Sequence, residues 1–143
     1  MQLITSLLIS FYLFIPPGWL TNLEDAKKQA KTEHKYILLN FSGSDWCGPC
    51  IELTRNVFQT EIFNKYAAEN LVLVNADFPR SKKHQLDFKQ KAINEALAQT
   101  YNKSGAFPLT LLLDENGKVI QKWEGAPANS PAVFISMLKP RSK

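Results

Sequence analysis

The sequence predicts an α/β protein in which helices cover both faces of a mixed central sheet. Two nearly continuous apolar runs, at residues 36–41 and 71–77, are typical of strands that are buried on both faces. Helical stretches precede and separate these runs. A third apolar run, at 107–113, leads into an Asp-Glu-Asn-Gly turn, and residues 119–123 suit an antiparallel partner strand. Strands that alternate with helices and then close on a hairpin indicate a three-layer α/β/α sandwich.

The first half of the chain is expected to begin with a helix. Thr21 and Glu24 have the spacing of a capping box, which predicts a helix start at this point. Three apolar residues share one face of that helix: Leu23, Ala26 and Ala30. The strand at 36–41 is followed by a loop at 42–45. A helical stretch to about residue 57 and another from 60 to 69 come next.

The second half contains two further predicted helices. Residues 85–101, after a loop at 78–83, form a helix whose expected core residues are Leu86, Ile93 and Leu97. Ser130, followed by Pro131 at the first helical position, predicts a last helix that ends near Pro140.

Length and composition bound the kind of protein. A chain of 143 residues with 45% hydrophobic and 21% charged residues suits one globular domain and excludes a disordered chain. Such a chain can bury a core without disulfides or a structural metal, so its two cysteines are not needed as staples. The net charge of +4 is mild. The densest basic run, residues 80–84, is too short for a nucleic-acid site, and we expect a solvated loop there.

The first 19 residues differ from the rest and are expected to form a leader, with the domain at 20–143. No charged side chain occurs in residues 1–19, and residues 3–15 are almost continuously apolar. This run is shorter than the roughly 20 residues of a spanning helix but suits a signal peptide. It lacks a preceding Lys or Arg and a clear cleavage site, so an uncleaved membrane anchor or a buried N-terminal element stays open. We expect export, to the periplasm.

Cys47 and Cys50 form a C-x-x-C motif between a buried strand and a helix. Unpaired backbone N–H groups at a helix N-terminus stabilise a thiolate, the form of cysteine that attacks a disulfide. Cys47 should feel this field most, so we expect it to be the attacking and more exposed thiol, with Cys50 resolving the mixed disulfide. Pro49 lacks an N–H group and suits the first helical turn.

Other uses of the two cysteines fit the residues less well. A zinc site would need His34 or His84, and neither has the usual ligand spacing, so both are expected to be surface residues. A structural disulfide across such a small loop would stabilise the fold only weakly. Two inert core thiols do not fit a loop that contains Gly48 and Pro49. We therefore expect neither a metal nor a cofactor.

The motif Trp46-Cys47-Gly48-Pro49-Cys50 is identical to the active-site motif of the thioredoxin family, and the resemblance covers nearly all of residues 20–138. Three further segments resemble that family: the strand end at 75–77, the Asn116-Gly117 hairpin with the later Gly125, and the Phe107-Pro108 segment, which is similar to its cis-proline loop. The leader and the 42–45 loop look more like secreted bacterial thioredoxin-like proteins.

The resemblance implies a thioredoxin fold and a thiol–disulfide oxidoreductase without a bound cofactor. Cys47 and Cys50 would be catalytic. The residues implied to contact substrate are Trp46, Gly48, Pro49, Phe107 and Pro108, with a cis Phe107–Pro108 bond facing the cysteines.

The sequence also departs from the thioredoxin pattern. The family's buried Asp beneath the cysteines falls on Asn40, or on Phe41 if no gap is allowed, and its Lys partner falls on Leu73. Since no carboxylate is present in either alignment, the family's usual proton acceptor for Cys50 is missing, and water or Asp45 could take its place. The helix proline is absent from residues 53–55, and Phe107 is bulkier than the usual residue and would narrow the groove.

The function predicted from these features is reduction or exchange of disulfides in exported proteins. The expected partners are protein disulfide substrates and an upstream electron donor or acceptor, and the chain is expected to be a monomer. The Gly48-Pro49 pair resembles the reducing members of the family. Two alternatives stay open: a partner-binding module that uses the groove around Trp46 and Pro108, and a metal-handling module such as a copper carrier, each with secondary redox activity.

Overall fold

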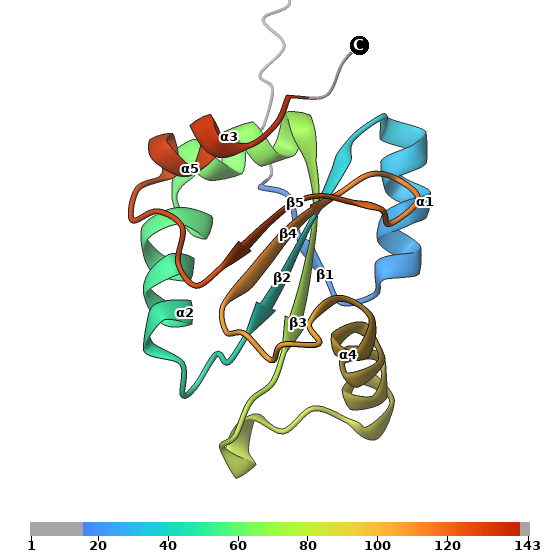
Figure 1. The fold of residues 1–143 in the computed structure, drawn as a ribbon, viewed down its shortest axis with the longest axis vertical. Coiled ribbons are helices and arrows are strands. Elements are labelled where there is room, and N and C mark those ends of the chain that lie inside the picture. The colour runs from blue at the N-terminus through green and yellow to red at the C-terminus, as the bar shows by residue number, and fades with distance from the viewer. Residues whose placement is uncertain (1–15, 141–143) are drawn as a thin grey trace, which may run out of the picture.

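The computed structural model describes residues 16–140, which fold into the predicted three-layer sandwich (Figure 1). The expected leader lies largely outside the described residues, because residues 1–15 are not among them. Among residues 16–140, no helix is both long and apolar enough to cross a membrane.

The central sheet has five strands in the order β1-β3-β2-β4-β5. β1 and β2 pair parallel with β3, whereas β4 pairs antiparallel with both β2 and β5, so the sheet is mixed as predicted. The strands are β1 (Trp19–Leu20), β2 (Tyr36–Ser42), β3 (Leu71–Asp77), β4 (Leu109–Leu113) and β5 (Val119–Glu124). The short β1 was not predicted as a strand of the domain, and its first residue lies in the segment expected to be the leader.

Helices cover both faces of this sheet (Figure 1). One face carries α1 (Leu23–Glu33) and α4 (Phe88–Tyr101), and the other carries α2 (Gly48–Leu53), α3 (Glu61–Asn70) and α5 (Pro131–Met137). A π-helical turn at Thr54–Phe58 continues α2, and a 3₁₀ turn at Lys82–His84 precedes α4.

Strand side chains alternate between two cores, as the pleat of a sheet requires. On the side of α1 and α4, strand residues such as Leu39, Phe41 and Val74 pack with buried helix residues that were predicted to lie inside: Leu23, Ala26 and Ala30. On the other side, Leu38 and Leu73 lie in a core that contains the aromatic rings Phe58, Phe63 and Phe134. These three rings have centroids 5.2–6.1 Å apart.

The start of α5 agrees with the sequence-based prediction, whereas the starts of α1 and α4 differ from it. Ser130 caps α5 as predicted, since its Oγ accepts from the N–H of Val133 at 3.3 Å. The capping box at Thr21 is wrong: Asn22 caps α1, and its Oδ1 accepts from the N–H of Glu24 at 2.8 Å. α4 begins three residues later than predicted, because Asp87 is its cap.

The core side of α4 is more polar than predicted. Leu86, Ile93 and Leu97 are only half-buried, and the one fully buried residue of this helix is Asn94. Its Nδ2 donates to the carbonyl oxygen of Asp77 at 2.9 Å, which ties α4 to the end of β3. A buried amide with a backbone partner satisfies both groups, whereas hydrophobic spacing alone does not reveal such a residue.

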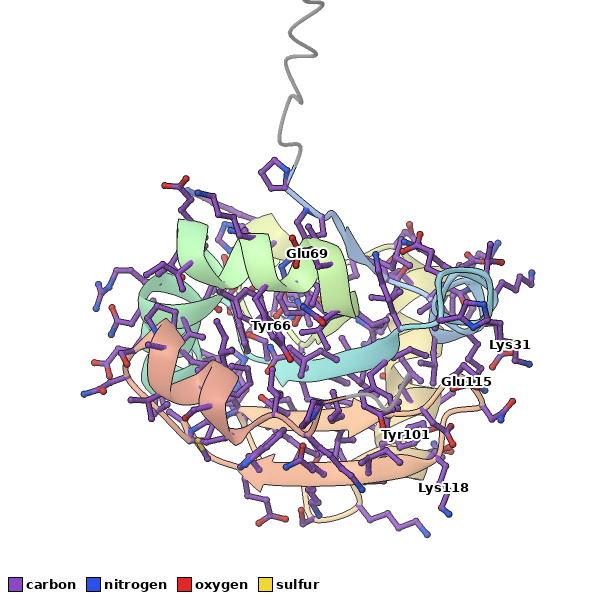
Figure 2. The ribbon with its side chains drawn as sticks, turned by 90° about the horizontal axis from the view of Figure 1, so that it is seen from above. Lys31, Tyr66, Glu69, Tyr101, Glu115 and Lys118 are labelled. Atoms are coloured by element: carbon purple, nitrogen blue, oxygen red, sulfur yellow. A yellow bond between two sulfur atoms is a disulfide. The ribbon has the colours of Figure 1, made fainter. Side chains whose placement is uncertain are left out.

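The hairpin between β4 and β5 forms as predicted. Gly117 has φ +86°, and Asp114 Oδ1 accepts from the N–H groups of Asn116 and Lys118, each at 2.9 Å. Tyr101 of α4 lies beside this turn in Figure 2 and donates its hydroxyl to the carbonyl oxygen of Gly117 at 2.8 Å. This turn lies at the end of the sheet opposite Cys47, because β4 runs antiparallel to β2.

Candidate active site

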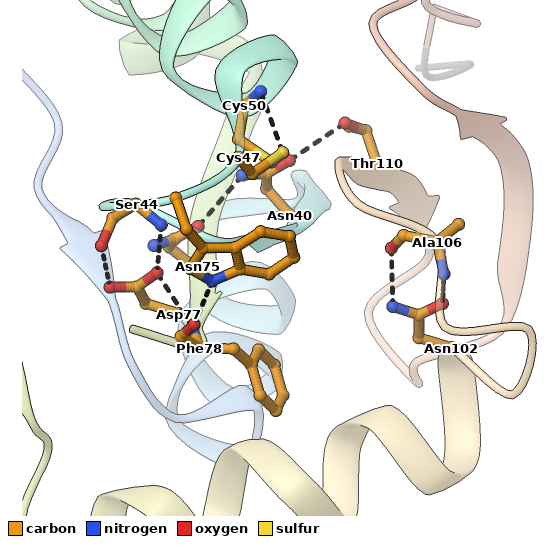
Figure 3. Close-up of a disulfide and its surroundings, with 11 residues drawn as sticks. Asn40, Ser44, Cys47, Cys50, Asn75, Asp77, Phe78, Asn102, Ala106 and Thr110 are labelled. Atoms are coloured by element: carbon orange, nitrogen blue, oxygen red, sulfur yellow. Dashed lines mark hydrogen bonds between the residues drawn. A yellow bond between two sulfur atoms is a disulfide. The ribbon is translucent and has the colours of Figure 1, made fainter. Parts of the chain in front are cut away.

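Cys47 and Cys50 lie where β2 passes into α2, and a disulfide bond joins them (Figure 3). Cys47 is the N-cap of α2, and Pro49 occupies its first turn, as predicted. Gly48 and Pro49 are exposed, while the two cysteines are 5% and 1% exposed, with Cys47 the more accessible. The motif therefore presents its two middle residues to solvent around a nearly buried sulfur pair.

The backbone N–H of Cys50 donates to Cys47 Sγ at 3.3 Å. A donor at this place stabilises a negative charge on Cys47 Sγ once the disulfide is reduced, together with the other free N–H groups of the helix start. A π-helical turn follows directly, in which the N–H of Gln59 bonds to the carbonyl of Thr54 at 2.8 Å. The sequence indicated only that the family's helix proline is missing here, with no sign of the π-helical turn.

Trp46 is held between the active-site loop and two neighbouring segments. Its indole Nε1 donates to the carbonyl oxygen of Phe78 at 2.7 Å, and its ring meets Phe107 edge-on, with centroids 5.4 Å apart. The guanidinium of Arg80 lies 3.7 Å from the indole centroid, a cation–π contact. Gly43 leaves room for the indole, because a Cβ at that position would overlap it.

Phe107 and Pro108 lie on the loop that leads into β4, and the peptide bond between them is cis, as expected. Pro108 is buried, and its carbonyl oxygen accepts from the N–H of Gly125 at 2.8 Å. The contact between Phe107 and Trp46 brings this loop against the cysteine motif. Asn102 braces the loop with two bonds of 2.9 Å to the N–H and carbonyl of Ala106 (Figure 3), a role that sequence reasoning missed.

Beneath the disulfide lies an uncharged chain of three side chains (Figure 3). Thr110 Oγ1 donates to Asn40 Oδ1 at 3.1 Å, and Asn40 Nδ2 donates to Asn75 Oδ1 at 3.0 Å. Asn40 and Thr110 are 3% and 0% exposed. The sheet register pairs Asn40 with Asn75.

The sheet register shows whether Asn40 or Phe41 occupies the position of the family's buried acid. Asn40 shares its face of β2 with Leu38, the face that α2 covers, while Phe41 packs in the opposite core. Leu73 lies in the apolar core beside Trp19 and Phe58. The position beneath the cysteines is therefore occupied by an amide with an amide partner.

A cavity of about 550 Å³ adjoins Cys50 on this side of the sheet. Its lining combines apolar rings with neutral polar groups, and its single charged residue is Arg55. The lining residues are Trp19, Asn40, Ser42, Ser44, Cys50, Ile51, Thr54, Arg55, Phe58, Gln59 and Asn75. A cavity of this size with polar groups in its lining has room for water beside Cys50.

Asp45, the other proton acceptor considered for Cys50, does not line this cavity and is bonded to a neighbouring segment. Its carboxylate accepts from the N–H groups of Arg80 and Ser81 at 2.9 and 2.8 Å, and it pairs with His84 Nδ1 at 3.0 Å. The Arg80 N–H, and then those of Ser81 and the His84 ring, hold the pKa of Asp45 below its usual value. A carboxylate with a lowered pKa is a weak base, and this one anchors a loop.

His84 and His34 are both surface residues, as predicted. His84 is exposed beside Asp45, and His34 lies at the end of α1 with φ +54°. Within the part of the chain that the structure describes, no three His, Cys, Asp or Glu side chains gather as a candidate metal site.

Comparisons with known proteins agree with this geometry. A family model described as thioredoxin-like matches residues 18–114. The disulfide bond reductase DsbH of Chlamydia pneumoniae is 34% identical over 115 residues, which span 80% of this chain and 67% of that protein. The thioredoxin-related protein DsbJ of the same organism is 26% identical over 73% of this chain, and the chain spans only 29% of its length.

Solved structures show the same relationship. A DsbH oxidoreductase structure superposes with a TM-score of 0.74 at 31% identity, covering 85% of this chain and 81% of that one. A thioredoxin from Thermus thermophilus superposes with a TM-score of 0.61 at 13% identity, covering 85% of this chain and 84% of that one, which supports the fold alone.

The sandwich, the cysteine pair at the helix start and these relatives define the class of the protein, a thiol–disulfide oxidoreductase with a thioredoxin fold. The chain belongs to the thioredoxin-like family. The fold and the class of activity predicted from the sequence are thus both confirmed.

Proposed function

We propose that the chain reduces disulfide bonds in exported proteins, with Cys47 as the attacking thiol and Cys50 as the resolving thiol. The observation that carries this assignment is the N–H of Cys50, which donates to Cys47 Sγ at the mouth of α2. This donor favours a thiolate on Cys47, whereas Cys50 lies inside the first turn with 1% of its surface exposed.

The proposed reaction starts from the reduced protein. Cys47 thiolate attacks one sulfur of the substrate disulfide, forming a mixed disulfide and releasing the other substrate sulfur as a thiolate. Cys50 then loses its proton and attacks Cys47 Sγ, which forms the bond present in this structure and releases the second substrate sulfur. Two electrons pass to the substrate, and each released thiolate takes up a proton.

Water in the cavity beside Cys50 is the proposed proton acceptor for the resolving step. The cavity reaches Cys50, and the two amide side chains that line it, Asn40 and Asn75, cannot ionise. No protein carboxylate is needed in this scheme. The resolving step then depends on the pKa of Cys50 itself.

The substrate is proposed to lie across the exposed Gly48-Pro49 segment. Trp46 and Phe107, which contact each other, would form one wall of this groove, and Pro108 would form its floor beside Cys47. The backbone of Phe107 would pair with an extended substrate segment, as an edge strand does.

The proposed redox direction is supported by the relatives, and the proposed location is supported by the expected leader. DsbH is named a disulfide bond reductase, and the Gly48-Pro49 pair supports the same direction here. An upstream dithiol donor must then return two electrons to the Cys47–Cys50 disulfide. The apolar residues 3–15 support export to the periplasm, where this domain would act as a monomer.

Reduction of insulin by dithiothreitol, with the protein as catalyst, tests the activity. We expect the wild-type chain to accelerate insulin precipitation and Cys47→Ser to abolish that acceleration. Failure of the wild-type chain would favour the partner-binding alternative, and a metal titration of the reduced chain would then test the metal-handling one. Cell fractionation tests the location: intact, unprocessed chain in the cytosol would contradict export.

A further inference from the structure

The basic run at residues 80–84 lies beside the active site, which the sequence did not indicate. Arg80, Lys82, Lys83 and His84 are all exposed, and we call these four residues the basic rim. The run follows Phe78, whose carbonyl oxygen accepts from the Trp46 indole. The basic rim therefore starts two residues after Phe78, which bonds to Trp46 of the cysteine motif.

Asp45 fixes the basic rim in place. Three of its contacts reach this segment: the N–H of Arg80, the N–H of Ser81 and the ring of His84, at 2.8–3.0 Å. Ser81 then caps the 3₁₀ turn at Lys82–His84, with its Oγ accepting from the N–H of Lys83 at 3.3 Å. Because Asp45 precedes Trp46 directly, the same loop that presents Cys47 also positions the basic rim.

Arg80 places a positive charge on the Trp46 wall of the groove. Its guanidinium lies 3.7 Å from the centroid of the Trp46 indole, and Trp46 adjoins Cys47 in the chain. The N–H donors at the edge of the guanidinium can still bond to other acceptors while its face contacts the indole. Arg80 itself is exposed.

The nearby carboxylates keep their negative charge, but none of them forms an ion pair with Arg80, Lys82 or Lys83 among residues 16–140. The Asp45 carboxylate is taken up by the loop, Asp77 accepts from Ser44, and Asp87 caps α4. Among the ion pairs formed within residues 16–140, only that of His84 with Asp45 involves the basic rim. Arg80, Lys82 and Lys83 are thus exposed, and Arg80 lies on the Trp46 wall of the groove.

We infer that the basic rim selects disulfide substrates whose segment next to the reacting cysteine carries Asp or Glu side chains. Carboxylates on a segment that lies across Trp46 would meet Arg80 first and Lys82 and Lys83 beyond it. Charges at the edge of an interface act mainly on the rate of encounter and on partner choice, and salt weakens them. This inference names a substrate class for the proposed reductase site and rests on that function.

The test uses the reduced full-length chain and two disulfide-linked peptides that differ only in charge, with Glu or Lys flanking the cysteine. We expect kcat/KM to be about tenfold higher for the Glu peptide at low ionic strength, and the ratio to fall as salt is added. In the double variant Lys82→Glu with Lys83→Glu, the ratio should fall to about one or below, while both peptides are still reduced.

A matched control separates local from net charge. Lys31→Glu with Lys118→Glu makes the same charge change at the opposite end of the sheet, where both residues lie in Figure 2. This control should keep the wild-type preference. Equal kcat/KM for the two peptides, or a preference that survives in the Lys82/Lys83 variant, would overturn the inference and leave the reductase function intact. If neither peptide were reduced, the proposed function itself would fail.

Discussion

Asn40 and Asn75 face each other on β2 and β3 directly beneath the Cys47–Cys50 disulfide, with Asn40 Nδ2 3.0 Å from Asn75 Oδ1. Thr110 on β4 completes the set by donating to Asn40. A lone buried charge at such a place is costly, and an amide pair satisfies its polar atoms without one. The resolving cysteine therefore has neutral side chains beneath it and a cavity at its side.

Replacing Asn40 by Asp places a carboxyl group in this neutral site. Burial should raise its pKa above the unfolded value of about 3.9, because the charged form loses hydration. Relative to wild type, the variant should therefore lose stability as pH rises from about 4 to the raised pKa, by about 1.4 kcal/mol for each pH unit between the unfolded and folded pKa values. Urea unfolding across this pH range measures the loss.

The matched control for that variant is Asn75→Asp. Asn75 is half-buried, so the same chemical change there should cost less. A pH-independent stability of Asn40→Asp, or an equal loss in both variants, would contradict the account of a buried neutral site. The pH profile of insulin reduction by Asn40→Asp should also gain a step at the pKa of the new carboxyl group.

Thr110→Val removes the hydroxyl donor to Asn40 while keeping the side-chain shape. Asn40 Oδ1 would then be buried with one partner fewer, and we expect a loss of about 1–3 kcal/mol in the free energy of unfolding. Thr110→Ser keeps the hydroxyl and should restore part of this loss. If the Val variant were as stable as wild type, the hydrogen bond would not matter to the fold.

Gly43→Ala should displace Trp46, because the added Cβ would overlap the indole ring. The bond from Nε1 to the carbonyl of Phe78 and the contact with Phe107 would both weaken. We expect the tryptophan fluorescence to shift. We also expect kcat/KM for insulin reduction to fall about tenfold or more, because a displaced Trp46 would no longer position the substrate. Unchanged activity would show that Trp46 does not shape the groove. Gly18→Ala is the control, because a Cβ there meets no atom within 4 Å and Gly18 is not part of the proposed groove.

Asp45→Ala should release the segment that carries the basic rim. The N–H groups of Arg80 and Ser81 lose their acceptor, so their amide hydrogens should exchange faster while exchange in the sheet stays unchanged. The pKa of Asp45 is lowered in the folded protein. The stability that its carboxylate contributes is therefore fully present above the unfolded-state pKa of about 3.9, and it is lost as pH falls through the lower, folded-state pKa. Amide exchange followed by mass spectrometry tests this, and equal exchange in variant and wild type would contradict the anchor.

The sequence was sufficient to predict the sandwich because strong local signals agreed with each other. The apolar run at 71–77 became a strand with the predicted bounds, and the Asn116-Gly117 turn formed the predicted hairpin. The motif around Cys47 placed the helix start correctly. Such features depend on residues close in sequence.

Features that depend on distant contacts were missed. Asn94 is buried because the carbonyl of Asp77 needs a donor, and Asn102 because the loop at Ala106 needs a brace. Asp45 is tied to a loop 35 residues further on, a contact that its position beside the cysteine motif does not reveal. No periodic pattern in the sequence reveals these pairings.

The assignment of the two cysteines is tested most directly by trapping the mixed disulfide. Reduced Cys50→Ser and Cys47→Ser variants are each mixed with a disulfide-bonded protein substrate, quenched with acid and weighed by mass spectrometry. The account predicts a stable adduct of the Cys50→Ser variant, linked through Cys47, and none with Cys47→Ser. A stable adduct through Cys50 alone would contradict it.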